Sequence, residues 1–558
     1  MDPEASAELT RKNDNFIKEY VKHHKQALEA LRAKARALQF RGHWFIIGDR
    51  EYKHKRRQYA TTSFPERDVS PRIILYPVNK YDIKNALKLC RELKMAIAVR
   101  TGGHQYCGYS STRPLNMQLD LSETFREYHY DKGKNVLRCG VSHALGPWAK
   151  ENHKHKIYLP MGMCAHVHLG GHVHTGGWGI VARSHGLLAD HVLAFDIILA
   201  SGAEEHIVRP VRGKTSQHND DVYYAVLGGG RGGDFGIVTH WEFKPLRDKD
   251  YPHSQCYTFL WLWSKEKMEA AVRQMEELSK LCADGTVPPD YEFMLSITGC
   301  GWMNVLSEPI KEEINQQASL TEARDGLSFP VPHLIQMWMC FTNKKGADDQ
   351  FDNQWFESFA SKVGPPLIHH RKRIPVSKGI AEYFIMNHDR EMDYPFVKRA
   401  RVTMRLPDGF AEKYTERMDK ITSLPAAHCQ HLVSQMQIYA GGAVAEYGKE
   451  GITAYSWRNQ AFAMGHDSFY SDDWFCGDQR ANAEQWQNEN DEAFIGEQGA
   501  FADADMRNFA YTFGDRVLEN VWHNYYDSQE KYDRLRRIKG ELDPDGLFSA
   551  DEFSLKPM

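Results

Sequence analysis

The sequence predicts an α+β protein of two domains, and three observations predict it. The 558 residues exceed what one hydrophobic core usually serves. Short strand patterns alternate with helical patterns from about residue 73 to 246. Longer amphipathic helices and further strand patterns follow. We expect boundaries at 1–66 for an N-terminal helical extension, 67–248 for the first domain, 249–515 for the second and 516–558 for a closing segment.

Composition excludes several classes of protein. Hydrophobic residues make up 42% and charged residues 26% of the chain, which is ordinary for a globular protein. A net charge of -4 gives no field that would attract nucleic acid or an acidic membrane, so we expect neither as a partner. Ten cysteines without a CxxC pair argue against a zinc module or a disulfide framework. With no signal-peptide pattern, we expect reduced thiols and a cytoplasmic location.

The N-terminal extension is predicted to contain an amphipathic helix over residues 7–40. Its apolar side chains recur at helical spacing and should pack on the body of the protein, although a partner-binding helix is the alternative. These side chains are Phe16, Tyr20, Leu28, Leu31, Ala35 and Leu38.

The first domain is predicted from short strands and one clear helix. Asp82 is expected to cap a helix whose apolar residues run from Ile83 to Leu93. A buried strand should end at Arg100. Other strand patterns lie at 74–77, 117–121, 135–140, 191–202 and 236–246.

The second domain is predicted as mixed α/β. A long amphipathic helix is expected over 265–281, and a polar helix follows the domain over 531–544. Strand-like runs lie at 292–299, 333–341, 401–406 and 434–442.

Three glycine-rich segments, at 99–111, 161–180 and 227–239, are candidate ligand loops. Glycine allows close backbone approach, and successive turn amides can cradle phosphate oxygens. The third segment holds a GxGxxG match at Gly228, Gly230 and Gly233, but a strand pattern follows it where a Rossmann site needs a helix. No P-loop occurs, so a nucleotide would bind in another geometry.

The second glycine segment also contains four alternating histidines: His166, His168, His172 and His174. On a strand, each pair would share a face and could bind a metal ion. Structural histidines and a cofactor loop are the other interpretations. The glycine pairs in the same segment favour a backbone that surrounds a ligand, and we expect no metal.

TGGH at 101–104 after a buried strand, with GMC at 162–164 and GGHVHTGGWG at 170–179, resembles the berberine-bridge-enzyme-like and hexose-oxidase-like flavoproteins of the vanillyl-alcohol-oxidase superfamily. The resemblance extends over 182–198, 228–239 and 524–548. It implies a two-domain flavoprotein with a split FAD-binding domain, to which the closing segment returns, and a mixed α/β substrate domain. It also implies FAD bound covalently twice, with His104 on the C8α methyl and Cys164 on C6.

The resemblance and the glycine loops together imply a set of cofactor-binding residues. Departures from the family pattern at Ala165, His168, Thr175 and Asp234 concern details of the loops. The expected residues are His104, Cys164, Arg100, Thr101, Gly102, Gly103, Gln105, Gly108, Gly162, Val167, Gly170, Gly171, His172, Gly176, Gly177, Gly179, Ile180, Gly236, Ile237 and Val238.

The activity implied is an oxidase that moves a hydride from a secondary alcohol or hemiacetal of a carbohydrate-like substrate to flavin N5, while oxygen becomes hydrogen peroxide. Val167 stands where the family controls oxygen access. Its alternative role is to pack the loop. The alternative functions are an oxidative cyclase or dehydrogenase of secondary metabolism, and a flavin-binding protein without catalysis.

The catalytic base is the weakest point of the resemblance, because the family's tyrosine is Phe513 here and its Glu or Tyr position is Ile438. We therefore expect Tyr511 or Tyr439 to serve as base, with Arg458 folding over the pocket to lower its pKa. Gln435 and Gln437 alternate on one strand face and could orient a polyhydroxyl substrate.

Overall fold

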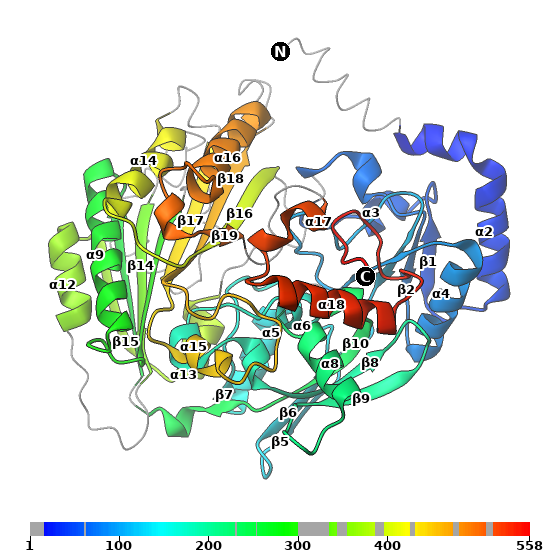
Figure 1. Cartoon of the computed structure of the whole chain (residues 1–558), viewed down its shortest axis with the longest axis horizontal. Coiled ribbons are helices and arrows are strands. Elements are labelled where there is room, and N and C mark those ends of the chain that lie inside the picture. Colours follow the sequence, from blue (N-terminus) through cyan, green and yellow to red (C-terminus); the bar gives the residue numbers. More distant parts are fainter. Residues whose placement is uncertain are drawn as a thin grey trace.

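The computed structural model describes residues 16–60, 63–228, 232–252, 254–298, 334–342, 354–385, 395–423, 430–471, 479–508 and 517–558. Helices pack on sheets that are mostly antiparallel, which confirms the α+β class (Figure 1). Two smaller sheets form one half of the molecule, and one large antiparallel sheet forms the other.

The first small sheet has the strand order β1 (His43–Ile46), β2 (Ile73–Tyr76), β4 (Met117–Asp120), β3 (Ile97–Arg100). β2, β4 and β3 are parallel, and helix α4 (Lys80–Leu93) forms the crossover. β1 pairs with β2, so a segment assigned to the extension from sequence contributes a strand here. The cap of α4 is Asn79, not Asp82 as predicted, because Asp82 instead accepts hydrogen bonds from the backbone amides of Arg41, Gly42 and Val78.

The second small sheet is antiparallel, in the order β5 (Tyr128–Asp131), β6 (Val136–Gly140), β10 (Ile237–Phe243), β8 (Val192–Ile198), β9 (Glu204–Val208). β10 directly follows the third glycine segment, which confirms the strand predicted there and excludes Rossmann geometry. β7 (Ile157–Tyr158) and β11 (Leu246–Arg247) form a separate pair. Helices of this half include α5 (Leu145–Lys154), α6 (Leu169–His174), α7 (Ala182–His185) and α8 (Gln217–Val226).

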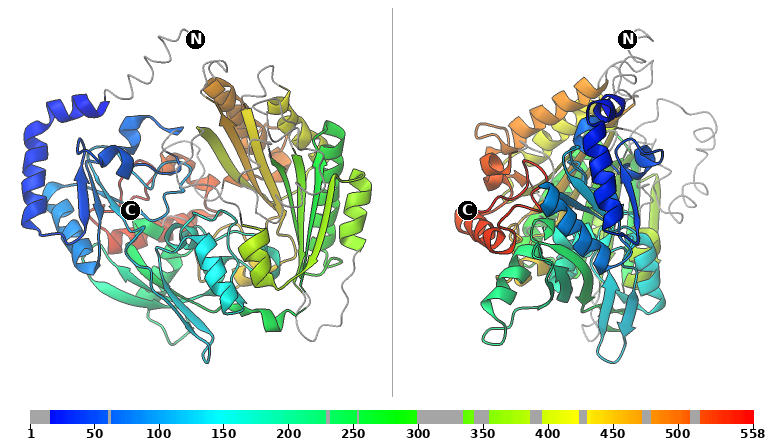
Figure 2. Two further views of the ribbon diagram at one scale, coloured as in Figure 1. Left: turned by 180° about the vertical axis from the view of Figure 1, so that it is seen from behind. Right: turned by 90° about the vertical axis from the view of Figure 1, so that its right-hand side faces the viewer.

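Within the described residues, the large sheet has eight strands. Their order is β15 (Ile368–Arg373), β12 (Gln255–Leu262), β14 (Leu334–Phe341), β13 (Tyr291–Thr298), β17 (Gln430–Ile438), β18 (Phe462–Tyr470), β16 (Phe396–Thr403), β19 (Arg507–Asn508). Helices α9 (Lys265–Ala283), α12 (Gln354–Val363), α14 (Phe410–Thr422) and α16 (Gln479–Ile495) pack along it (Figures 1 and 2).

The two faces of this sheet have different neighbours. On β13, Phe293, Leu295 and Ile297 pack in the core beneath the helices. Met294 points the opposite way and lines a cavity shared with the other half. Strand alternation therefore gives the sheet one structural face and one face available to a ligand.

Both ends of the described chain pack on the half with two small sheets. Leu28, Leu31 and Ala35 of α2 (Lys25–Ala37) are buried in its core, which confirms that the N-terminal helix packs on the body. Near the C-terminus, the Ile97 amide donates to the Leu547 carbonyl at 2.7 Å, and α18 (Gln529–Leu542) lies over α8. The other α-helices of the described ranges are α3 (Tyr52–Lys55), α13 (Val376–Lys378), α15 (Ala443–Gly448) and α17 (Leu518–Val521). Among the described residues, no helix has the length and apolarity that crossing a membrane requires.

Candidate active site

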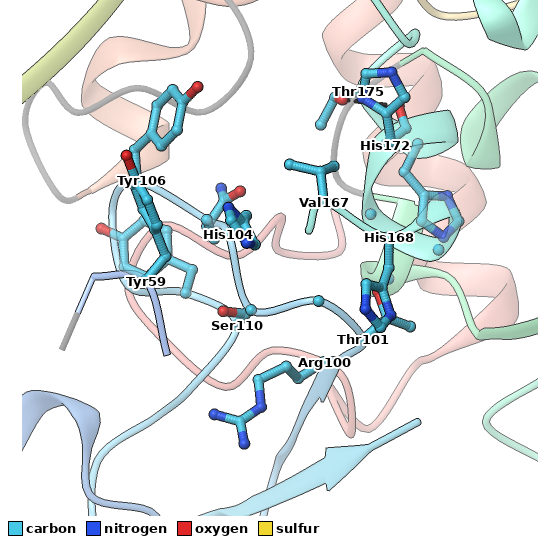
Figure 3. Close-up of a pocket in the computed structure, with 18 of the residues that line it drawn as sticks. Tyr59, Arg100, Thr101, His104, Tyr106, Ser110, Val167, His168, His172 and Thr175 are labelled. Carbon is cyan, nitrogen blue, oxygen red and sulfur yellow. Dashed lines mark hydrogen bonds between the residues drawn. The ribbon is translucent and has the colours of Figure 1, made fainter. Parts of the chain in front are cut away.

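A cavity of about 310 Å³ lies between the glycine loops and the open face of the large sheet. Figure 3 shows His104, Tyr59 and Tyr106 on one side of it and Val167, His168 and His172 on the other. Most of the expected cofactor residues line this cavity: Arg100, Thr101, Gly102, Gly103, His104, Gln105, Gly162, Cys164, Val167, Gly170, Gly171, His172, Gly179, Ile180, Gly236 and Val238.

Four expected cofactor residues do not belong to the cavity lining: Gly108, Gly176, Gly177 and Ile237. Ile237 is fully buried and alternates with Gly236 and Val238, so its side chain points to the opposite face of β10. A Cβ on Gly176 would lie 2.9 Å from the Tyr455 ring, so this glycine serves packing between the two halves.

The first two glycine segments contact each other at the cavity. A Cβ on Gly170 would lie 2.6 Å from the Thr101 side chain, and a Cβ on Gly102 would lie 2.9 Å from the His168 amide. His172 fixes the second segment internally, because its Nε2 accepts a hydrogen bond from the Gly162 amide at 2.8 Å. Burial lowers the pKa of His172 to about 4, so the ring is neutral and can accept at neutral pH.

The two predicted tether residues lie on the same cavity. His104 follows β3, and its ring stacks on Tyr59 with centroids 4.8 Å apart. Cys164 is a half-buried free thiol. Burial raises the pKa of Cys164 to about 11, although the nearby Lys398 ammonium opposes the increase.

Lys398 is a cavity residue that sequence reasoning missed, because the predicted strand began at Arg401 and β16 begins at Phe396. Strand register pairs it with Asp467 on β18, and its Nζ lies 2.9 Å from Asp467 Oδ2. Its Nζ also donates to the Tyr59 hydroxyl at 3.1 Å. Burial would lower the pKa of Lys398, but Asp467, Tyr59 and Tyr106 raise it well above its usual value. The cavity therefore contains a buried ammonium group.

Of the two candidates for the catalytic base, the structure describes only Tyr439. Tyr511, like Phe513, lies outside the described residues. Tyr439 is buried beside Tyr455 and Trp457 in a separate cluster, and burial raises its pKa well above the usual value. Its side chain is not part of the cavity lining. The position of Tyr439 therefore gives no support to its role as base, which stays a prediction.

The expectation that Arg458 folds over the pocket is wrong. Arg458 forms a two-pronged ion pair with Asp190, with both N···O distances at 2.9 Å. Its guanidinium packs over Tyr455. The positive charge in the cavity comes from Lys398 instead.

The two glutamines of β17 have separate roles. Gln437 accepts from Trp178 Nε1 at 2.8 Å and donates to the Gly179 carbonyl at 2.9 Å, so it ties the sheet to the cysteine-containing segment. Gln435 also lines the cavity and is half-buried. Of the two, Gln435 is better placed to contact a substrate.

The segment that contains the four histidines is not a strand. The prediction that each pair shares one strand face, as in a metal site, is therefore wrong. Leu169–His174 form helix α6, in which positions two residues apart point in different directions. His172 is held by the Gly162 amide and His174 by the Val226 carbonyl. Over the described ranges, no group of three or more metal-ligating side chains was found.

Comparison with known proteins agrees with this geometry. Residues 71–207 match the family model of the FAD binding domain, and residues 501–552 match the model named "Berberine and berberine like". An uncharacterized FAD-linked oxidoreductase of Bacillus subtilis is 29% identical over 213 residues, which cover 38% of this chain and 45% of that protein. A monolignol oxidoreductase of Arabidopsis thaliana is 31% identical over 179 residues, covering 31% of this chain and 32% of that protein. Each match spans less than half of the relative's length.

Solved structures share the fold over nearly the whole chain. The glucooligosaccharide oxidase of Acremonium strictum aligns with a TM-score of 0.67 at 19% identity, covering 95% of this chain and 98% of that one. Physcomitrella patens BBE-like 1 aligns with a TM-score of 0.68 at 17% identity, covering 95% of this chain and 100% of that one.

The matched family model and the glycine-lined cavity identify an FAD binding domain in this chain. The chain contains an FAD binding domain and a berberine-like segment near its C-terminus, and its fold matches that of solved flavoproteins, which agrees with the resemblance found in the sequence. The residues present fit the cofactor, because glycine backbone lines the cavity and a thiol and an imidazole both reach it.

Proposed function

We propose that this chain is an oxidase whose FAD is bound covalently at His104 and Cys164, and that it oxidises a secondary alcohol or hemiacetal. The observation that carries the proposal is the presence of both nucleophiles on one glycine-lined cavity. An imidazole and a thiolate can each add to an electron-poor ring. A study of the Acremonium strictum glucooligosaccharide oxidase names a 6-S-cysteinyl, 8α-N1-histidyl FAD in that protein.

The bound flavin would supply the hydride acceptor, and the protein residues would position the donor carbon and accept the hydroxyl proton. Gln435 projects from the large sheet into the cavity and would orient the substrate hydroxyl. Trp178 and Met294 offer apolar surface beside it, suited to the face of a sugar ring. Tyr511 is the proposed proton acceptor.

The same two side chains favour a second candidate, a dehydrogenase or oxidative cyclase of secondary metabolism. Trp178 and Met294 would also pack on a planar aromatic alcohol. A monolignol oxidoreductase and an aclacinomycin oxidase are among the relatives of this chain. A substrate panel of oligosaccharides and aromatic alcohols, read by bleaching of the flavin without oxygen, separates the two candidates. A flavin bleached by neither class favours a protein without catalysis.

The covalent links are tested by precipitating the protein in acid. The precipitate should remain yellow, His104→Ala and Cys164→Ala should each keep one link, and the double variant should release FAD. A colourless precipitate from the unmodified chain would refute the attachment.

The use of oxygen is tested at Val167, which lines the cavity. Val167→Leu adds a methylene beside the proposed oxygen path. Reoxidation of the reduced enzyme should slow by about tenfold or more, the effect of ~1.4 kcal/mol on a barrier, while reduction by substrate changes little. Equal changes in both half-reactions would make Val167 a packing residue. A small-molecule substrate, oxygen and a cytoplasmic location, with no nucleic acid or membrane partner, complete the proposal.

A further inference from the structure

We propose that Lys398 is a positioning residue that activates Cys164 for its attachment to the flavin. This inference rests on the proposed function, since it concerns how the second covalent link forms. Substrate oxidation does not by itself require the buried charge of Lys398, and the inference gives that charge a role.

Lys398 is held in the cavity from several directions. Asp467 pairs with it across β16 and β18 at 2.9 Å, and the Tyr59 hydroxyl accepts from it at 3.1 Å. Its Nζ lies 4.3 Å from the centre of the Tyr106 ring and 5.1 Å from that of Tyr59. Such aromatic rings stabilise a desolvated ammonium group, so Lys398 keeps its charge although only 8% of it is exposed.

The same cluster joins the two tethers. Tyr59 stacks on His104, and Lys398, His104, Tyr106 and Cys164 all line the cavity. The titratable groups that act electrostatically with the Cys164 thiol are Lys398, Asp467, Tyr59 and Tyr106, and His104 lines the same cavity. Lys398 favours the thiolate, and Asp467 disfavours it.

The chemistry of attachment needs this help because the thiolate is the nucleophile. Even with Lys398 opposing the effect of burial, the pKa of Cys164 is raised to about 11, so about one thiol in a thousand is ionised at pH 8, and fewer would be without the ammonium group. Attachment forms a carbon–sulfur bond at C6 while the S–H and C6–H bonds break. The two protons and two electrons released pass to oxygen, which becomes hydrogen peroxide, so oxygen is the oxidant of the step.

The experiment follows attachment directly. Full-length protein made under riboflavin limitation is incubated with FAD and oxygen, and peptides carrying flavin on His104 or on Cys164 are quantified over time. Four variants are compared with the unmodified chain: Lys398→Met, Lys398→Arg, Asp467→Asn and the double variant Lys398→Met/Asp467→Asn. The double variant removes both charges together, so no unpaired charge is left buried.

We expect Lys398→Met and the double variant to slow the Cys164 link at least tenfold at pH 8, with the rate recovering as pH rises, while the His104 link is retained. Lys398→Arg should restore much of the rate. Asp467→Asn should accelerate the Cys164 link, which a merely structural role of the ion pair would not allow. A normal rate in the double variant, or slowing by Asp467→Asn, would overturn the proposal. An unmodified chain that links His104 but never Cys164 would instead refute the double attachment of the proposed function.

Discussion

The two walls of the cavity are built in different ways. The wall of glycine loops presents backbone, and its segments approach so closely that a Cβ on Gly170 would lie 2.6 Å from Thr101. The wall of the large sheet presents side chains, among them Met294, Lys398 and Gln435. A backbone wall suits a cofactor of fixed shape, whereas a side-chain wall can be changed residue by residue to suit a substrate. The sequence therefore predicts the cofactor, but it does not predict the substrate.

The largest expected effect concerns the base. Tyr511→Phe should lower the rate of flavin reduction by about 10²-fold, the usual scale for losing a general base. Tyr439→Phe should change it little, because Tyr439 packs outside the cavity lining. Stopped-flow reduction of both variants measures the difference. If flavin reduction is slower in Tyr439→Phe than in Tyr511→Phe, the substrate site must extend along the large sheet beyond the cavity lining as far as Tyr439.

The next effect tests the backbone wall. Gly170→Ala would force a methyl group against Thr101, destabilising the protein by ~1–3 kcal/mol and reducing flavin incorporation. The matched control is Gly465→Ala on β18, where a Cβ would meet no atom within 4 Å. Thermal unfolding and the ratio of flavin to protein measure both. Equal behaviour of the two variants would mean that close loop approach is not what builds this wall.

A smaller effect separates the two glutamines of β17. Gln437→Leu leaves Trp178 Nε1 and the Gly179 carbonyl without that partner, so stability should fall by ~1–3 kcal/mol. Gln435→Leu should leave stability nearly unchanged and raise KM for the true substrate by about tenfold, the effect of one lost hydrogen bond. Denaturant unfolding with steady-state kinetics distinguishes them. A stability loss in Gln435→Leu as large as that in Gln437→Leu would contradict the division of roles.

The smallest effect is the pH dependence of protein stability that comes from His172 in the glycine loops. The pKa of His172 is lowered to about 4, below its usual 6.5, so the unfolded chain binds its proton more readily. Its contribution makes stability fall as pH drops from about 6.5 to about 4. His172→Gln lacks this titration, so its melting temperature should depend less on pH in that window. Identical pH profiles would show that His172 does not titrate on unfolding.

Local sequence patterns predicted much of the fold. The strand ending at Arg100, the strand after the third glycine segment and the helix beginning at Lys265 all form as expected. Patterns failed where tertiary contacts decide the outcome. Asp82 binds the distant Arg41 and Gly42 amides rather than capping its helix, and two of the alternating histidines, His172 and His174, lie on helix α6.

The residues of the candidate site also fall into two groups, those that local motifs predict and those that only the fold brings together. His104 and Cys164 stand in short motifs that local sequence displays, and both reach the cavity. Lys398 comes near Cys164 only through the register of β16 against β18 and the docking of that sheet on the loops. Arg458 looked available in sequence, but Asp190, 268 positions away, binds it. Contacts between residues far apart in sequence depend on the whole fold, and no short motif encodes them.

The central claim is that one flavin joins His104 and Cys164, and digestion of the denatured protein tests it most directly. Mass spectrometry should find a single flavin-containing species in which the peptide with His104 and the peptide with Cys164 are held together by the same flavin. Two separate peptides, with flavin on one of them or on neither, would contradict the account.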